Sequence, residues 1–232
     1  MLQGTPGRVR QYYDEHPISE AHVLSALGGQ GRAGAPTADD LFEFDQDHYG
    51  GLAAVDALAR RAGVGPASRV LDVCAGLGGP ARFLASRRGS SVVAIELHAG
   101  RAAGAARLNR LVKQTRVTVV RADAASLPFT AGAFDACLSQ EALLHVADKP
   151  AVLRECHRVL GRGGRLAVHV DAHQAEIEIV ARKVEVVGIA AEEGGLELRR
   201  EHQAQVVVAA EGVELVLARA IEGDHLAAVA GL

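Results

Sequence analysis

The stretch from Val70 to Ala85 constrains the fold of this chain more than any other. It begins with a short apolar run that ends at Asp72, continues through a glycine-rich turn, and enters a helix-like segment at Pro80. An apolar run of this length is typical of a buried strand, glycine permits a tight turn, and proline suits the first turn of a helix. The N–H groups that open such a helix face a ligand held over the turn. The stretch therefore predicts a ligand cradle with Asp72 at the carboxyl end of its strand.

Two classes of ligand fit this cradle. The residues from Gly76 to Ala81 match the pattern G-x-G-x-x-G/A of dinucleotide sites. Asp72 argues against a dinucleotide, because a carboxylate beside the turn repels a pyrophosphate; it suits a cationic ligand such as S-adenosylmethionine. Glu96, at the end of the next expected strand, can accept both hydroxyls of a ribose, and NAD would use the same acid. We expect S-adenosylmethionine, with an NAD-dependent oxidoreductase as the rival.

Length and composition limit the kind of protein. A chain of 232 residues forms one domain, or one domain with an extension, and can bury a substantial core. The net charge of -3 is spread over both signs, which predicts neither a nucleic-acid partner nor a membrane partner, and no apolar run approaches the ~18 residues of a membrane span. The N-terminus has no apolar core, so we expect no signal peptide. Three scattered cysteines indicate reduced thiols, a cytoplasmic location and no C-x-x-C zinc site.

The hydrophobic pattern divides the chain at about residue 64. Residues 1–64 predict a helical cap: short helices on either side of Pro17, a glycine-rich linker over 28–36, a capping box formed by Thr37 and Asp40, and a helix from about Gly51. Residues 65–232 then alternate between strands and helices. The expected strands are 69–73, 91–96, 116–121, 134–139 and 165–170, and the expected helices are 80–88, 99–113 and 148–160. This alternation predicts a Rossmann-like, doubly wound α/β fold with a mainly parallel sheet and helices on both faces.

The pattern weakens after Asp171. Residues 172–182 are open to a helix, residues 183–190 read as a strand, and residues 205–218 read as a hairpin that gives the sheet an antiparallel C-terminal edge. Residues 183–220 carry no aromatic side chain, so we expect them to complete the sheet without binding substrate.

Residues from about 40 to 171 resemble the class I S-adenosylmethionine-dependent methyltransferases. The resemblance is carried by the run DVCAGLGGPARFLA from Asp72, by Glu96, by the run RADA that ends at Ala124, and by the run SQEALLH that ends at His145. The last run, with the segment from Arg154 to Gly164, is similar to the N-methyltransferases of phosphoethanolamine, sarcosine and dimethylglycine. The motif GGPAR is shared with sterol C-methyltransferases. The chain departs from the family pattern at Cys74, where glycine is usual, and in lacking aromatic residues after Phe134.

The resemblance implies a cofactor site and a catalytic site. The implied cofactor-binding residues are Asp72, Ala75, Gly76, Gly78, Glu96, Leu97, Asp123, Ala124 and Gln140, with Asp123 facing the adenine amino group. The helix start at His48–Gly51 would hold the carboxylate of the methionine moiety.

His145 is the predicted general base, because it follows the fourth strand of the fold and a histidine titrates near neutral pH. Tyr49 is the candidate that orients the imidazole or shares its proton. Tyr12 and Tyr13 either line the substrate pocket or pack against a helix.

These observations together predict a methyltransferase that acts on a small molecule, at an amine nitrogen. The alternatives are an O- or C-methyltransferase of a natural product or lipid, and a module that binds the cofactor without turnover. The sequence leaves the oligomeric state undecided, with a homodimer as one option. His169, Asp171 and His173 form the only metal-like spacing, which is expected by chance among ten histidines, so we expect no metal.

Overall fold

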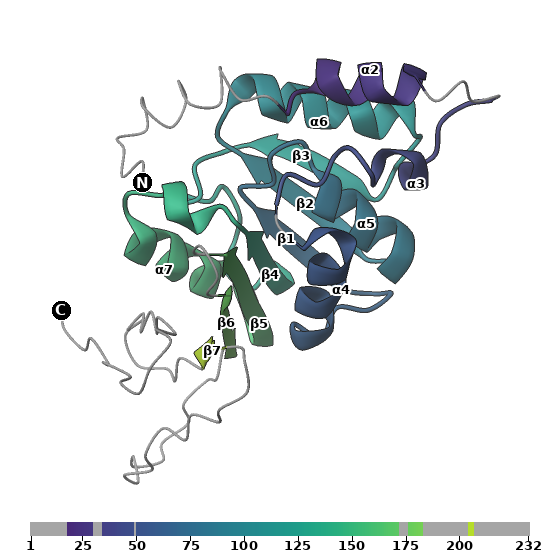
Figure 1. Ribbon diagram of the computed structural model, residues 1–232. Helices are drawn as coiled ribbons and strands as arrows, with labels where there is room; N and C mark the ends of the chain where they lie inside the picture. The colour runs from purple at the N-terminus through teal and green to yellow at the C-terminus, as the bar shows by residue number, and fades with distance from the viewer. Residues whose placement is uncertain (1–17, 30–33, 49, 172–175, 183–203, 207–232) are drawn as a thin grey trace, which may run out of the picture.

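The computed structural model shows a three-layer α/β fold in which a central sheet lies between helices (Figure 1). The structure describes residues 18–29, 34–48, 50–171, 176–182 and 204–206. The described strands form one sheet in the order β3-β2-β1-β4-β5-β6-β7. Its first five strands in the chain are β1 (Arg69–Val73), β2 (Ser91–Glu96), β3 (Val117–Arg121), β4 (Phe134–Gln140) and β5 (Leu160–Asp171). These five pair in parallel, which confirms the predicted Rossmann-like sheet.

Helices cover both faces of the sheet, as predicted. The described helices are α2 (Glu20–Gly29), α3 (Ala38–Leu41), α4 (Gly51–Arg61), α5 (Gly79–Arg88), α6 (Ala99–Leu111), the short 3-10 helix η1 (Leu143–His145) and α7 (Lys149–Val159). Successive residues of β1 point to opposite faces: Val70 packs in the core layer with α4 and α5, and Leu71 in the layer with α7. In Figure 1, α4 and α5 accordingly lie on one side of the strands and α7 on the other. None of the described helices is long and apolar enough to cross a membrane.

The segment after β5 differs from the sequence expectation. Residues 176–182 form strand β6 (Glu176–Arg182), which pairs antiparallel with β5. The sequence leaves this segment open to a helix. The run Glu-Ile-Glu-Ile-Val alternates between charged and β-branched residues, and this period of two fits a strand. Strand β7 (Ala204–Val206) pairs with β6. The predicted strand at 183–190 and almost all of the hairpin at 205–218 lie outside the described residues. The antiparallel C-terminal edge that this hairpin would form therefore stays a prediction.

The described part of the first 64 residues packs directly on the sheet domain. The capping box of Thr37 and Asp40 is present at the start of α3, as predicted, while α2 extends through Gly28 and Gly29, where the sequence suggested a linker. Helix α4 contributes to the same core layer as α5. The chain after α3 crosses the glycine turn so closely that a Cβ atom on Gly79 would lie 2.2 Å from the carbonyl oxygen of Asp45. A separate cap domain with its boundary at residue 64 stays a prediction.

A buried arginine ties this N-terminal segment to the glycine turn. Arg82 is fully buried on α5, and its Nε donates to Asp45 Oδ2 at 2.9 Å. Its remaining nitrogens donate to Asn109 Oδ1 on α6, at 2.9 Å, and to the carbonyl oxygen of Leu77 in the turn. Burial raises the pKa of Asp45 and lowers that of Arg82, and each partner opposes the shift of the other. The guanidinium therefore joins three segments at a point where water has no access.

We expect Asp45→Asn to lower the free energy of unfolding by about 3–5 kcal/mol, because it leaves the buried Arg82 charge without its counterion. Urea unfolding followed by circular dichroism measures the change. The matched control is Asp39→Asn, which breaks the ion pair with Arg87 on the surface, where both side chains are 54% exposed. The control should change stability by less than about 1 kcal/mol. Equal losses for the two variants would contradict the buried pair's role.

Candidate active site

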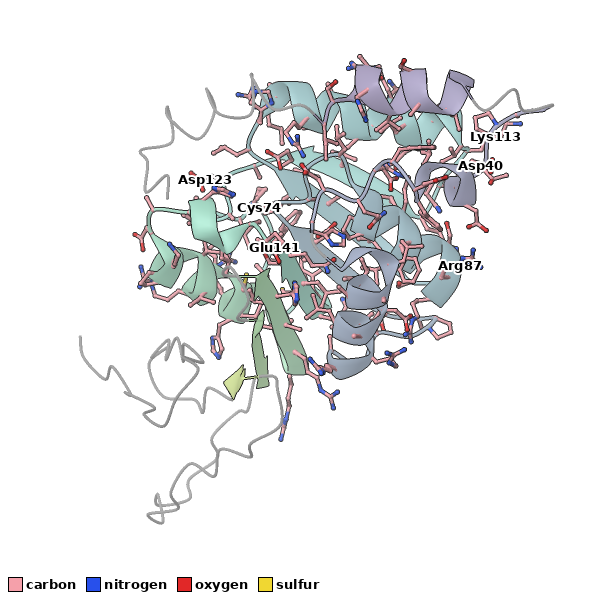
Figure 2. All side chains as sticks on the ribbon, in the orientation of Figure 1. Asp40, Cys74, Arg87, Lys113, Asp123 and Glu141 are labelled. Carbon is pink, nitrogen blue, oxygen red and sulfur yellow. The ribbon has the colours of Figure 1, made fainter. Side chains whose placement is uncertain are left out.

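A cavity of about 360 Å³ opens where the parallel strands β1 to β4 end. Nine of the predicted site residues line it: Asp72, Ala75, Gly76, Glu96, Leu97, Asp123, Ala124, Gln140 and His145. Figure 2 shows Cys74, Asp123 and Glu141, which also line it, on the same side of the molecule, away from Asp40, Arg87 and Lys113. A cavity of this size suits a ligand of cofactor dimensions. The structure thus brings together residues that lie up to 73 positions apart in the chain.

The glycine turn holds its shape through left-handed backbone conformations at three residues. Cys74, Gly76 and Gly78 have φ values of 60°, 57° and 79°. The Ala75 N–H donates to Ile95 O and the Gly78 N–H donates to Ala75 O, each at 2.8 Å. Glycine adopts such conformations without strain, whereas Cys74 does so at a cost of order 1–3 kcal/mol. The departure from the glycine pattern therefore falls at a position where the turn needs a left-handed residue.

Gly78 does not line the cavity, unlike the other predicted members of the turn. It is the N-cap of α5, and a Cβ atom there would lie 3.3 Å from Arg82 Nη1 and 3.5 Å from the Ala105 methyl group. The φ of 79° favours glycine here, because other residues adopt this backbone conformation only with strain. Its contact with the cofactor stays a prediction.

Asp72 is buried at the floor of the cavity. It is 4% exposed, and its Oδ2 has no hydrogen-bond partner among the described residues. Burial, and next the charge of Glu96, raise the pKa of Asp72 to about 7, while the Ala81 N–H and the charge of Arg82 act in the opposite direction. An unpaired buried carboxylate is costly, and a positively charged ligand group in the cavity would compensate it. This buried acceptor therefore fits the ammonium of S-adenosylmethionine, which donates hydrogen bonds and carries positive charge.

Glu96 and Asp123 are held in place by backbone N–H groups. The carboxylate of Glu96 accepts from Gly76 N at 2.9 Å and from His98 N at 2.7 Å. An ionised carboxylate has about four acceptor positions, so two stay available for the hydroxyls of a ribose. Asp123 Oδ1 accepts from Ala125 N at 2.9 Å, which fixes the side chain in the loop after β3. The backbone thus orients both acids before any ligand binds.

The structure adds cavity residues that sequence reasoning missed. Asp45, Asp47 and Arg101 line the cavity, and Arg101 bridges segments by donating to Asp47 Oδ2 at 2.5 Å and to Ile18 O at 3.0 Å. Glu141, at the end of β4, also lines it. No spacing pattern signals the Arg101 contacts, because their partners lie 54 and 83 positions away in the chain.

The predicted histidine lines the cavity, whereas the predicted tyrosines are not among the described residues. His145 lies on η1 and lines the cavity, as does His48, whose Nε2 is 3.0 Å from Gln46 Oε1. Tyr12, Tyr13 and Tyr49 lie outside the described residues. Burial raises the pKa of the Cys74 thiol, so Cys74 is not a ready nucleophile.

Of the metal-like triplet His169, Asp171 and His173, the first two residues lie on β5. His169 is buried, and its Nδ1 lies 3.1 Å from Glu141 Oε1, while His173 lies outside the described residues. Within the part of the chain that the structure describes, no three histidine, cysteine or acidic residues are grouped to hold a metal ion.

Comparisons with known proteins show which proteins the chain is similar to. Residues 71–168 match the family model of the methyltransferase domain. The sarcosine/dimethylglycine N-methyltransferase of Halorhodospira halochloris is 38% identical over 168 residues, which are 72% of this chain and 59% of that protein. Other relatives are named as O- and C-methyltransferases. The chain spans about half the length of the curated relatives it matches.

Two solved structures share the fold. Phosphoethanolamine N-methyltransferase 2 of Haemonchus contortus, in complex with phosphomonomethylethanolamine and S-adenosylhomocysteine, aligns with a TM-score of 0.58 at 24% identity, over 72% of this chain and 36% of that one. The [4+2]-cyclase SpnF aligns with a TM-score of 0.56 at 29% identity, over 73% of this chain and 62% of that one.

Residues 71–168 carry the methyltransferase domain, and the relatives support a class I S-adenosylmethionine-dependent methyltransferase with S-adenosylmethionine as its cofactor. Within that class it is similar to the sarcosine/dimethylglycine N-methyltransferase named above.

We expect Asp72→Asn to stabilise the cofactor-free protein in a pH-dependent way. With a pKa of about 7, folded Asp72 keeps its proton at pH values where the unfolded chain, with a usual pKa near 4, has released it. The folded state thus binds more protons between these values, and wild-type stability falls as the pH rises. The gain from Asn should be near zero at pH 4 and grow to at most about 4 kcal/mol by pH 7.

Guanidinium unfolding between pH 4 and 8 measures this difference. The control is Asp135→Asn: Arg69 lowers the pKa of Asp135, so its loss should be felt at neutral pH and vanish as the pH falls. Parallel stability profiles for wild type and Asp72→Asn would show that Asp72 ionises normally.

Proposed function

We propose that this chain methylates a small-molecule amine at nitrogen. The observation that carries the proposal is a single cavity that joins a buried, incompletely paired acid (Asp72), a ribose-type acceptor (Glu96) and a histidine after the fourth strand (His145). Seven acidic residues line this cavity: Asp45, Asp47, Asp72, Glu96, Asp123, Glu141 and Asp148. Such a lining favours cationic occupants, which both a sulfonium cofactor and an amine provide. The N-methyltransferase relative supports the same acceptor class.

When bound, S-adenosylmethionine supplies a methyl group on a positively charged sulfur. The neutral thioether that remains after transfer is the leaving group. In this proposal Asp72 pairs with the cofactor ammonium, Glu96 accepts the ribose hydroxyls and Asp123 accepts from the adenine amino group. Ala75, Gly76, Leu97, Ala124 and Gln140 provide the surrounding contacts. These residues would hold the cofactor in one orientation, so that its methyl group could be transferred to an acceptor bound beside it.

His145 acts on the acceptor in this proposal. Most aliphatic amines carry a proton at neutral pH, and the nitrogen needs a free lone pair to attack. A neutral imidazole at the edge of the cavity can accept that proton and hold the nitrogen in line. Tyr49 is proposed to orient the imidazole.

The relatives and solved structures include proteins with other named functions. Relatives that are named as O- and C-methyltransferases share this fold, and so does SpnF, which is named as a cyclase. Fold alone therefore does not assign the acceptor. Radiolabelled methyl transfer to sarcosine and dimethylglycine, compared with phenol, tests the nitrogen proposal; labelled phenol with unlabelled amines would overturn it. A homodimer and a cytoplasmic location stay predictions.

We expect S-adenosylhomocysteine to raise the melting temperature and NAD to leave it unchanged. Ligand at 100 times its Kd stabilises a protein by about 2.7 kcal/mol, which shifts a domain of this size by several degrees. Glu96→Ala should weaken S-adenosylhomocysteine binding by roughly 1–3 kcal/mol, because the acceptor of two hydroxyls is lost. Glu43→Ala, an exposed acid outside the cavity, is the control. Equal affinity of Glu96→Ala and wild type would remove Glu96 from the site.

His145→Ala should retain cofactor affinity and lose about 10²- to 10⁴-fold in turnover, the usual contribution of a positioned general base. The loss should shrink as the pH rises, because more of the amine is then unprotonated. Initial rates between pH 6.5 and 9.5 measure it, with His157→Ala, an exposed residue of α7, as the control. A defect confined to cofactor binding would mean that His145 is not the base.

A further inference from the structure

Glu141 lies in an unusual backbone conformation at the end of β4. Its φ of 53° places a non-glycine residue in the left-handed region, and its N–H donates to His169 O on β5 at 2.9 Å. Successive residues of a strand point to opposite faces, yet Gln140 and Glu141 both line the cavity. The left-handed residue breaks the alternation and turns the second side chain toward the same space. Strain of this kind at a cavity indicates a functional demand on Glu141.

His169 holds a complementary position behind Glu141. It is 4% exposed on β5, it does not line the cavity, and its Nδ1 lies 3.1 Å from Glu141 Oε1. The side chain of Glu141 is itself only 10% exposed. The two residues therefore meet at a backbone hydrogen bond and at a side-chain contact, from two neighbouring strands. Among the described residues the Nδ1 atom has no other hydrogen-bond partner, so the Glu141 carboxylate at 3.1 Å is the polar group it faces.

We propose that His169 is a positioning residue that holds the Glu141 carboxylate toward the acceptor, so that Glu141 binds an amine nitrogen in the cavity. The inference rests on the proposed function and narrows its substrate class to amines whose nitrogen carries positive charge or a proton to donate. Glu141 touches the acceptor, and His169 acts only through Glu141. A carboxylate aimed by a buried imidazole loses little side-chain freedom when the acceptor arrives, which favours binding.

Steady-state kinetics with sarcosine as the probe amine separates this role from a structural one. Glu141→Gln should raise KM for sarcosine about 10- to 100-fold, as expected for the loss of a charge-assisted contact, with unchanged affinity for S-adenosylhomocysteine. His169→Leu should raise KM in the same direction with kcat within about threefold. His169→Asn, which keeps an N–H donor near the Nδ1 position, should restore part of the loss. The double variant should be no worse than Glu141→Gln alone, because one interaction is removed in both.

The control for burial is Val168→Ala, the preceding residue of β5, which is 1% exposed and packs in the core away from Glu141. It should lower stability without changing KM. If His169→Leu and Val168→Ala have the same KM, or if the double variant shows the product of the two single effects, His169 does not act through Glu141.

A measurement on the apo protein tests the contact without turnover. In protein labelled with ¹⁵N-histidine, the resonance that disappears in His169→Asn identifies the imidazole. Glu141→Gln should shift this resonance, and Asp123→Asn, another acid of the cavity, should not. An unshifted resonance overturns the inference. If the shift is seen but wild type methylates no amine, the contact stands, while the proposed function and Glu141's role as the amine ligand both fail.

Discussion

The charge of Arg82 is the constraint on which the rest of the structure depends. Placed on the first helix after β1 with no exposure to water, it must find its partners inside the protein. It finds them in three places: the segment before α4, the glycine turn and α6. The turn that shapes the cavity is therefore fixed by the same side chain that fixes the N-terminal segment over it. Formation of the cavity and docking of that segment are one event energetically.

The lining of the cavity also holds several features that disfavour the empty protein. Asp72 is buried beside another acid, and Cys74 and Glu141 hold backbone conformations that their side chains disfavour. Each of these features lowers the stability of the empty protein, and each lies on the lining of one cavity. A bound cation would relieve the first directly. At least the first of these costs therefore lies where a ligand can compensate it.

The sequence predicted the sheet and most of the cavity because both depend on local signals. β-branched residues mark β1 to β3, and acids of the site lie at the carboxyl ends of strands, as Asp72 and Glu96 do. It could not predict Arg101 with Asp47, or Glu141 with His169, because these contacts join distant segments through side-chain geometry. A helix over 172–182 is wrong for residues 176–182, because helix and strand signals are hard to separate in a short segment and pairing with β5 selects the strand.

The described residues that line the cavity run from Asp45 to Asp148, in the part of the chain before α7. The glycine turn, the strand ends and the acids of this lining are therefore encoded in one continuous stretch of the sequence. Recombination that keeps this stretch whole keeps the described lining with it.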